Sequence, residues 1–319
     1  HYPEAISWFY RPDYGVGYVF VANVFTTLIT LLLLIPDILP GIRAKVDGTV
    51  LKQILRYSFP ILILGIAGIF NQTADKILFP FLFDDKEYAN EQLGIYGACF
   101  KIAVVMVMFT QAFRYAYEPF IFAKNKSDDN KKAYSEAMKY FIIFALFILG
   151  VMFYIDILKY FVGPAYYPGL RVVPIVMLGE LFFGIYFNLS LWYKLIDQTR
   201  WGAYFSTIGC VATVSIILLF GPSYGYMACA WASFFCNLLM MLLSYFVGQK
   251  KFPIEYDLKS AFLYFGVATV LYVAGMALPI QSEWLRLGYR TILLGVFIAF
   301  MVKRDLPLRE LPYVGRFFR

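Results

Sequence analysis

The 319 residues are 61% apolar, 20% aromatic and 15% charged, whereas soluble domains are about 45–50% apolar and about 25% charged. One water-soluble core cannot bury that much apolar surface, so the composition excludes a soluble globular protein, and it also excludes a disordered chain, a disulfide scaffold and a coiled coil. The formal net charge of +7 then indicates basic cytoplasmic loops rather than a nucleic-acid partner.

Nine runs of mainly apolar residues, each near the length of about 20 residues that crosses the hydrocarbon of a bilayer, follow one another along the chain. They lie near 15–36, 57–83, 93–123, 140–162, 171–193, 202–221, 225–248, 259–279 and 284–302. The sequence therefore predicts an all-α polytopic transmembrane helix bundle of about nine spans. The chain begins with His1 rather than methionine, and no cleavable signal precedes the first run, so we expect an N-terminally truncated fragment.

The segment between the first two spans, 46–56, carries apolar residues at helical spacing: Val46, Val50, Leu51, Ile54 and Leu55. Its polar residues lie elsewhere around the helix. This pattern predicts an interfacial amphipathic helix that leads into the second span, and a short helix within a loop is the alternative.

The basic residues of the loops predict the orientation of the spans. Nineteen Lys and Arg residues fall in one set of alternate loops and only four in the other. The richer set is expected to be cytoplasmic, which places the N-terminus of this chain outside and its C-terminus inside. Because the loops are short, they leave no room for an extramembrane catalytic domain, and we expect no enzyme.

Seven polar or charged side chains within the spans are candidates for a substrate cavity, because such groups are costly in lipid and usually face a bundle interior or water. They are Asn71, Asp75, Lys101, Gln111, Arg114, Glu118 and Glu180. Asp75, Lys101 and Glu180 each lie eight or nine residues from the outer end of their span, or about 12–14 Å deep. We expect Lys101 to pair with Asp75, with Glu180 or with both, in a hydrated cavity open to the outside. The alternative is an ion pair that only fastens helices together.

A second group lies near the cytoplasmic end of the third span. Gln111, Arg114 and Glu118 follow the i, i+3, i+7 rule and share one stripe of the helix. Arg114 and Glu118 can line the cavity or form a simple interfacial pair that reaches water. Lys76, next to Asp75, is expected to point in a different direction.

The sequence offers no pattern for metal binding or covalent catalysis. All four cysteines lie inside apolar runs without a Cys-x-x-Cys pair, and the single histidine is His1. We therefore expect no metal site and no cofactor other than a coupling ion of unknown identity.

Several local stretches carry a family resemblance. They are GVGYVFVAN at 15–23, YSFP at 57–60, NQTADKIL at 71–78, TQAFRYAYEPF at 110–120, YFVG at 160–163, VVPI at 172–175 and WYK at 192–194. With them the chain resembles, over essentially its whole length, the bacterial polysaccharide (O-antigen and exopolysaccharide) flippases of the multidrug/oligosaccharidyl-lipid/polysaccharide exporter superfamily. The element at 110–120 is the most specific of these stretches.

The resemblance implies a domain organisation, because members of this family carry two pseudo-symmetric six-helix bundles. Residues 1–36 would hold an external segment and the last helix of a first bundle that this chain otherwise lacks, and 37–56 a cytoplasmic linker. Residues 57–248 would form the second six-helix bundle. Residues 249–319 would supply two trailing transmembrane helices and a basic cytoplasmic tail.

The resemblance also implies a function: moving a polyprenyl-pyrophosphate-linked oligosaccharide to the outer leaflet of the bacterial inner membrane, for polysaccharide or lipopolysaccharide biosynthesis. The transport would proceed by alternating access of rocking bundles. Lys101 and Arg114 would then be the cations for the substrate, and Asp75, Glu118 and Glu180 their partners or coupling-ion sites. Expected partners are the lipid-linked oligosaccharide, membrane lipids and glycan-assembly proteins, and no nucleic acid.

Three alternatives stay open. A cation-coupled drug antiporter of the same superfamily would keep its coupling carboxylate in the first bundle. A glycan polymerase or glycosyltransferase would need an external acidic pair, for which Asp84 and Asp85 are the only doublet. A structural membrane protein would not explain charged residues inside the spans.

Overall fold

The computed structural model describes residues 14–15, 17–42, 47–124, 130–278 and 280–306. Within these ranges the chain is helical apart from turns and short connections, and contains no strand. The all-α fold predicted from the sequence is confirmed. The contacts between residues divide the chain into two units, His1–Phe59 and Pro60–Arg319, which are described separately.

The first unit holds α1 (Gly17–Ile42) and the beginning of α2 (Gly48–Leu78). Asp47 caps α2, because its carboxylate accepts hydrogen bonds from the backbone N–H groups of Thr49 at 2.8 Å and of Val50 at 3.4 Å. From Gly48 the helix continues unbroken to Leu78. The described part of the segment 46–56 is therefore helical and continuous with the second expected span, and Val46 lies outside the described residues.

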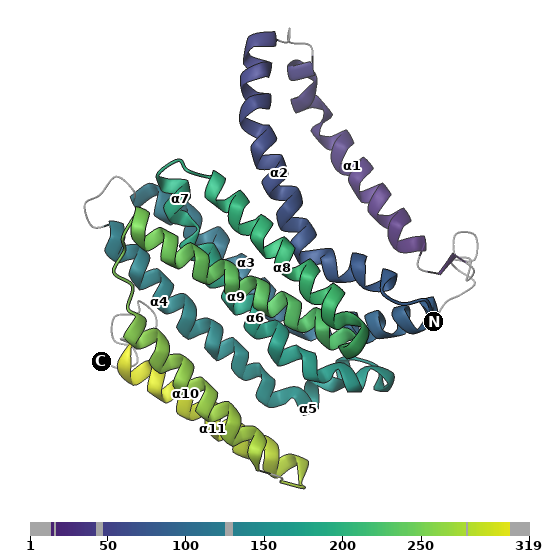
Figure 1. Ribbon diagram of the computed structural model, residues 1–319, viewed down its shortest axis with the longest axis vertical. Helices are drawn as coiled ribbons and strands as arrows, with labels where there is room; N and C mark the ends of the chain where they lie inside the picture. Colours follow the sequence, from purple (N-terminus) through teal and green to yellow (C-terminus); the bar gives the residue numbers. More distant parts are fainter. Residues whose placement is uncertain (1–13, 16, 43–46, 125–129, 279, 307–319) are drawn as a thin grey trace. The chain divides into compact units, whose positions relative to one another are not determined.

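The second unit begins within α2 and contains all the remaining elements. In chain order these are η3 (Phe79–Phe81), α3 (Lys86–Lys124), α4 (Asn130–Leu149), η4 (Gly150–Tyr154), α5 (Ile155–Leu158), η5 (Lys159–Phe161), η6 (Pro164–Arg171), α6 (Val172–Leu189), α7 (Leu191–Leu195), α8 (Arg200–Tyr224), α9 (Tyr226–Lys251), α10 (Leu258–Ala277) and α11 (Glu283–Arg304). Figure 1 shows α3, α4, α6, α8 and α9 packed side by side, with α10 and α11 forming a hairpin against α4.

Helix α6 lies at the centre of this unit, in contact with α3, α4 and α9. Its packing against α9 depends on Gly179, where an added Cβ atom would lie 3.2 Å from the Cα atom of Phe234. The absence of a side chain lets the two helix backbones approach closely. Buried aromatic and sulfur-containing side chains, among them Tyr96, Met106 and Phe141, fill the core around α6.

Eight described segments are long and apolar enough to cross a membrane, and they coincide with eight of the nine expected spans. The remaining span corresponds to α2, many of whose side chains lie outside the described part of the chain. Gly225, with φ +56°, turns the chain between α8 and α9, so the sixth and seventh expected spans are separate helices. The fifth expected span, 171–193, lies within one candidate membrane segment, Pro164–Leu195, in which Ser190 joins α6 to α7 with helical φ and ψ.

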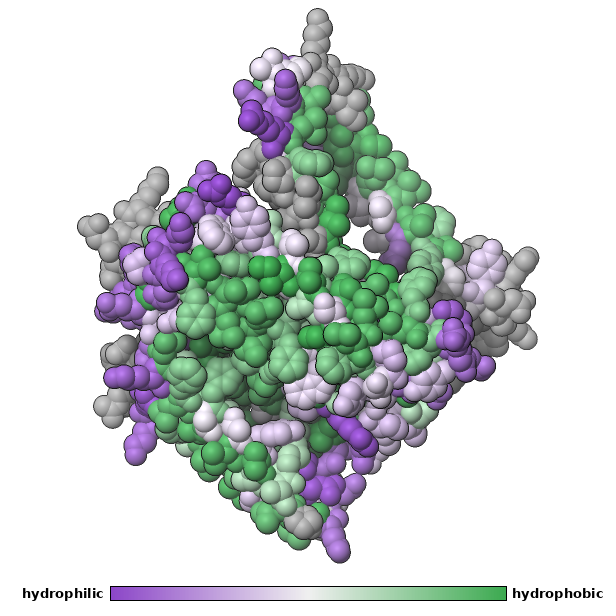
Figure 2. Space-filling model, viewed as in Figure 1, coloured by the Kyte–Doolittle hydropathy of each residue, from purple (hydrophilic) through white to green (hydrophobic). Residues whose placement is uncertain are grey.

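The surface of the second unit suits a lipid environment. Figure 2 shows apolar residues over the middle of the helices and hydrophilic residues gathered toward the helix ends. Large apolar side chains such as Val211, Leu219, Phe246 and Phe262 are exposed on these helices. In water such a surface would be an extensive exposed apolar patch. In a bilayer the same side chains would contact lipid tails, which are also apolar.

Ion pairs fasten the hairpin of α10 and α11 to the bundle at both ends. At one end, buried Arg290 donates to Asp156 at 2.7 Å and to the Phe153 carbonyl at 3.1 Å, and Arg286 donates to the same carboxylate at 2.8 Å. At the other end, Asp305 is paired with Lys139. Asp156 and Arg290 are therefore packing groups of this hairpin.

Candidate functional site

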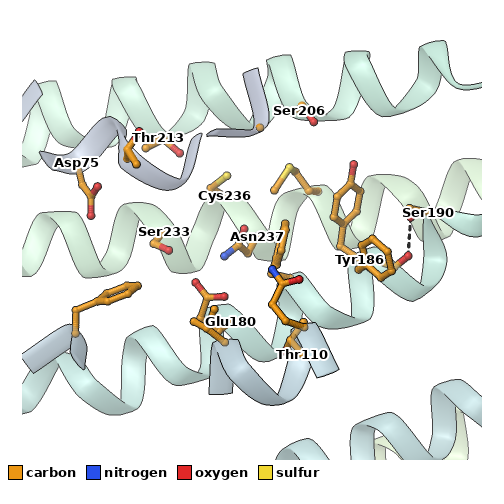
Figure 3. A pocket seen from close by; sticks show the side chains of 18 of the residues that line it. Asp75, Thr110, Glu180, Tyr186, Ser190, Ser206, Thr213, Ser233, Cys236 and Asn237 are labelled. Atoms are coloured by element: carbon orange, nitrogen blue, oxygen red, sulfur yellow. Dashed lines mark hydrogen bonds between the residues drawn. The ribbon is translucent and has the colours of Figure 1, made fainter. Parts of the chain in front are cut away.

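A cavity of about 390 Å³ lies inside the second unit, between α2, α3, α6, α7, α8 and α9 (Figure 3). Many of its lining residues are polar or charged, although apolar spans surround it. They are Thr73, Asp75, Lys76, Tyr96, Thr110, Gln111, Glu180, Tyr186, Ser190, Tyr193, Lys194, Ser206, Thr213, Ser233 and Asn237. A helix bundle that only had to pack would have filled this volume with apolar side chains.

Asp75 and Glu180 bring two carboxylates to the cavity wall. The Asp75 side chain is buried, and its Oδ1 atom accepts a hydrogen bond of 2.8 Å from the backbone N–H of Lys76. Figure 3 shows the Glu180 carboxylate directed toward Ser233 and Asn237 of α9. Within the described residues, neither carboxylate has a basic side chain within the 4.0 Å of an ion pair.

Lys76, and not Lys101, is the cation that lines the cavity beside these carboxylates. Its ammonium lies 4.8 Å from the centre of the Phe100 ring, which lines the same cavity. Lys76 was expected to point in a different direction from Asp75, and both side chains line the cavity.

The expected pairing of Lys101 with Asp75 or Glu180 is absent from the described structure, because the Lys101 side chain is exposed and does not line the cavity. The physical reason is helical phase. The cavity-facing positions of α3 include Phe100 and Val104, and Lys101 is turned by about 100° from Phe100 around the helix. Depth along the span, on which the pairing was predicted, does not determine the direction in which a side chain points.

The other candidates are distributed around the same cavity. Gln111 lines it, while the side chain of Asn71 lies outside the described residues. Arg114 and Glu118 lie next to the lining, with Nε and Oε2 3.7 Å apart. Glu118 also accepts a hydrogen bond of 2.7 Å from Lys194, which lies just past the end of the fifth expected span, 171–193.

Several lining residues on the later helices were missed from the sequence. Ser233 and Asn237 are four residues apart on α9, and Ser206 and Thr213 are seven apart on α8, so each pair shares one helix face. These isolated polar residues in apolar runs were the available signal. Tyr96 was missed as well. Its hydroxyl group is near the Asp75 carboxylate, without a hydrogen bond of regular geometry in the described structure.

The donor set of the cavity suits a monovalent cation or a hydroxyl-rich molecule better than a transition metal. No group of three or more His, Cys, Asp or Glu side chains that could hold a metal ion occurs among the described residues. Cys229 and Cys236 line the cavity from one helix, with no histidine beside them in the described ranges.

Comparisons with known proteins bear on the fold. No protein-family model matches the sequence, and no curated protein matches it. Among solved structures, the chain is similar to "Lipid II flippase MurJ, inward closed conformation", with a TM-score of 0.53 and 16% sequence identity over 86% of this chain. The match spans 60% of that protein's length. At this identity the likeness concerns the fold alone: the chain has an all-α membrane-protein fold similar to that of this flippase.

Proposed function

We propose that this chain takes part in moving a lipid-linked oligosaccharide, in the form of a polyprenyl-pyrophosphate glycan, across the bacterial inner membrane for polysaccharide or lipopolysaccharide biosynthesis. The observation that carries the proposal is the polar cavity of about 390 Å³ inside an apolar helix bundle, with Asp75 and Glu180 in its wall. Burying ionisable groups without a paired opposite charge is unfavourable, so such groups in a membrane protein mark substrate or ion pathways. The similarity of the fold to a lipid II flippase supports the same class of transport.

In this proposal Lys101 helps to attract the substrate, although its side chain does not line the cavity. A lysine at the centre of a membrane helix costs about 2.5–3.5 kcal/mol in contact with lipid. Its exposed position on α3 is therefore better explained by a water-filled pathway along this face of the helix than by lipid. An ammonium group there would attract the pyrophosphate of the substrate.

Asp75 and Glu180 are assigned to coupling. A carboxylate surrounded by hydroxyl and amide groups, as Glu180 is by Ser233 and Asn237, can exchange a proton or bind a monovalent cation. Either event changes the charge of the cavity and thereby shifts the equilibrium between the two arrangements of a rocking bundle. The identity of the coupling ion follows from the dependence of transport on a proton or sodium gradient.

The experiment is transport by the full chain reconstituted in liposomes, with a fluorescently labelled polyprenyl-pyrophosphate oligosaccharide as substrate. We expect the wild-type protein to move the label between leaflets faster than protein-free liposomes, and an imposed ion gradient to accelerate it. The E180Q and D75N variants should lose the response to the gradient. D84N, in the exposed turn after η3, is the matched control and should retain it.

A second candidate is a cation-coupled drug antiporter, because two carboxylates in one cavity also suit an organic cation. Offering ethidium in place of the labelled glycan separates the two functions. Transport of ethidium without transport of the glycan would replace the first proposal by the second, and transport of neither compound would reject both.

A further inference from the structure

The cavity inside the second unit is long as well as polar. One end is marked by Lys76, whose ammonium lies 4.8 Å from the centre of the Phe100 ring on α3. The other end is marked by Lys194, whose ammonium lies 2.7 Å from Oε1 of Glu118 on the same helix. Phe100 and Glu118 are 18 residues apart, which is about 27 Å at the rise of an α-helix. The cavity therefore forms a polar column along most of the thickness of about 30 Å of a hydrocarbon core.

The polar lining continues along the column well beyond Glu180. On α6, Glu180 and Ser190 are ten residues apart, or about 15 Å, and on α8, Ser206 and Thr213 are seven apart, or about 10 Å. A bound metal cation needs its oxygen ligands around a single point. A file of hydrogen-bonded waters instead needs polar partners at intervals over its whole length, and the lining provides partners in that arrangement.

Two hydroxyl groups of the polar column are buried without a hydrogen-bond partner among the described residues. They are the hydroxyl groups of Tyr96 and Thr110, which are 0% and 5% exposed. An unsatisfied buried hydroxyl is unfavourable, and in native proteins such groups usually bond to ordered water. Tyr96 and Thr110 are 14 residues apart on α3, or about 21 Å. The waters that they would bind therefore lie far apart in the polar column.

The volume of the polar column is sufficient for a continuous file of water. A water molecule occupies about 30 Å³ in the liquid, so the volume of about 390 Å³ would hold about thirteen molecules. Hydrogen-bonded oxygen atoms lie about 2.8 Å apart, so about ten molecules in line would bridge a length of about 27 Å. Water can therefore connect the two ends of the polar column without a gap.

We propose that the polar column is a water-filled proton pathway through the second unit, with Glu180 as the group that takes up and releases the proton. The Glu180 carboxylate accepts a proton from a water on one side and becomes the neutral acid. The acid then gives its proton to a water on the other side, so one proton leaves the polar column for each that enters. Tyr96 and Thr110 hold the waters in place. The role of the proton as coupling ion rests on the proposed function, whereas proton conduction itself does not.

The arrangement of the charged lining groups fits this pathway. Figure 3 shows Glu180 with Asp75 on one side of it and Tyr186 and Ser190 on the other. Asp75 therefore provides a second carboxylate between Glu180 and the end that Lys76 marks. Two carboxylates in succession allow a proton to be held at two points of its path.

The first test measures proton flux into liposomes that hold the full chain and the pH-sensitive dye pyranine. A potassium diffusion potential set by valinomycin drives the protons, and no lipid-linked substrate is added. We expect the wild type to acidify the lumen faster than protein-free liposomes do. E180Q should abolish this flux, because an amide does not exchange an acidic proton. Y96F and T110V should each slow it about fivefold, because each loses a hydrogen bond to water.

Exposed residues of the same types supply the matched controls. Y115F on α3 and T207V on α8 should conduct protons as the wild type does. Thermal unfolding midpoints establish that each variant is folded. If E180Q does not fold, E180D takes its place and should slow the flux without abolishing it, because it keeps the acid on a shorter side chain.

The outcomes of the flux assay separate this proposal from the proposed function. Folded wild-type protein that conducts no more protons than protein-free liposomes overturns the pathway. Sodium flux that E180Q abolishes, without proton flux, also overturns it and makes Glu180 a sodium site. Proton flux without glycan transport rejects the proposed function and leaves the pathway, whereas glycan transport without proton flux does the reverse.

The second test detects the water itself in the unsubstituted protein. Hydroxyl radicals generated from bound water by X-rays modify the side chains next to that water. Cys229 and Met240 line the polar column, whereas Cys99 and Met106 are equally buried outside its lining. We expect Cys229 and Met240 to be modified several times faster than Cys99 and Met106 in nanodiscs. Equal rates would show that the polar column is dry and would overturn the proposal.

Discussion

Asp75 and Glu180 define the chemistry of the cavity at the scale of single residues. Each is a carboxylate on a helix of an apolar bundle, without an ion-pair partner among the described residues. Lys76 lines the same cavity but forms no ion pair with either carboxylate among the described residues. Groups retained at such a cost are expected to serve function at the expense of stability.

Replacing Asp75 by asparagine tests this trade-off. Because D75N keeps the shape and removes a buried charge, we expect it to raise the free energy of unfolding by about 1 kcal/mol, or leave it unchanged. Ion-driven transport should be lost in the same variant. Thermal unfolding in detergent measures the first effect. A clear fall in the unfolding midpoint would instead make Asp75 a packing residue.

The residues of the site were only partly predictable from the sequence. The polarity of Asp75, Gln111 and Glu180 within apolar runs was sufficient to select three residues that line the cavity. Polarity was not sufficient to choose between Lys76 and Lys101 as the cation that lines the cavity. The prediction considered depth along the span and left out the 100° turn of the helix between neighbouring residues.

At the scale of the elements, the packing of α6 against α9 holds the two sides of the cavity in place. Gly179 of α6 lies where a Cβ atom would be 3.2 Å from the Phe234 backbone, while an added Cβ at Gly266 of α10 would meet no atom within 4 Å. We expect G179V to destabilise the protein by about 1–3 kcal/mol through overpacking. G266V is the matched control and should change the unfolding midpoint far less. Equal effects of the two variants would show that the close helix contact is not important.

The hairpin of α10 and α11 gives a prediction about pH. Burial alone would raise the pKa of the Asp305 carboxyl, but hydrogen bonds from Lys139 and Tyr264 hold that pKa below its usual range. Because the folded pKa is depressed, this contribution to stability is present above the usual pKa of an aspartate and is lost as the pH falls through the folded pKa.

Thermal unfolding midpoints measured from about pH 3 to about pH 7 check the contribution of Asp305. The wild type should lose stability below about pH 4, and D305N should lose less over the same range because its side chain does not titrate. D84N, whose carboxylate is exposed, should follow the wild type. A D305N profile parallel to that of the wild type would contradict the role of Asp305.

Most element boundaries could be predicted, because hydrophobic runs of membrane length are a strong signal in sequence. Eight expected spans coincide with described helices. Ser190 joins α6 to α7 with helical φ and ψ, and its hydroxyl donates to the Phe187 carbonyl at 2.6 Å. The burial of Arg290 was missed, because its partner Asp156 lies far away in the sequence.

At the scale of the whole molecule, the distribution of Lys and Arg residues predicts which loops are cytoplasmic. Single-cysteine variants in a background without the four native cysteines test this orientation in intact cells. D84C lies in a predicted outer loop and K251C in a predicted cytoplasmic one. A membrane-impermeant maleimide should label D84C, and should label K251C only after the cells are permeabilised. The opposite pattern would invert the topology.

The central claim is that the cavity inside the second unit is needed for transport, and filling it is the most direct test. S233F places an aromatic ring at the cavity wall, whereas S215F places the same ring on an exposed position of α8. Transport of the labelled lipid-linked oligosaccharide is measured in liposomes for both variants, at equal amounts of folded protein. The account predicts that S233F is inactive and that S215F transports at the wild-type rate. Wild-type transport by folded S233F would contradict it.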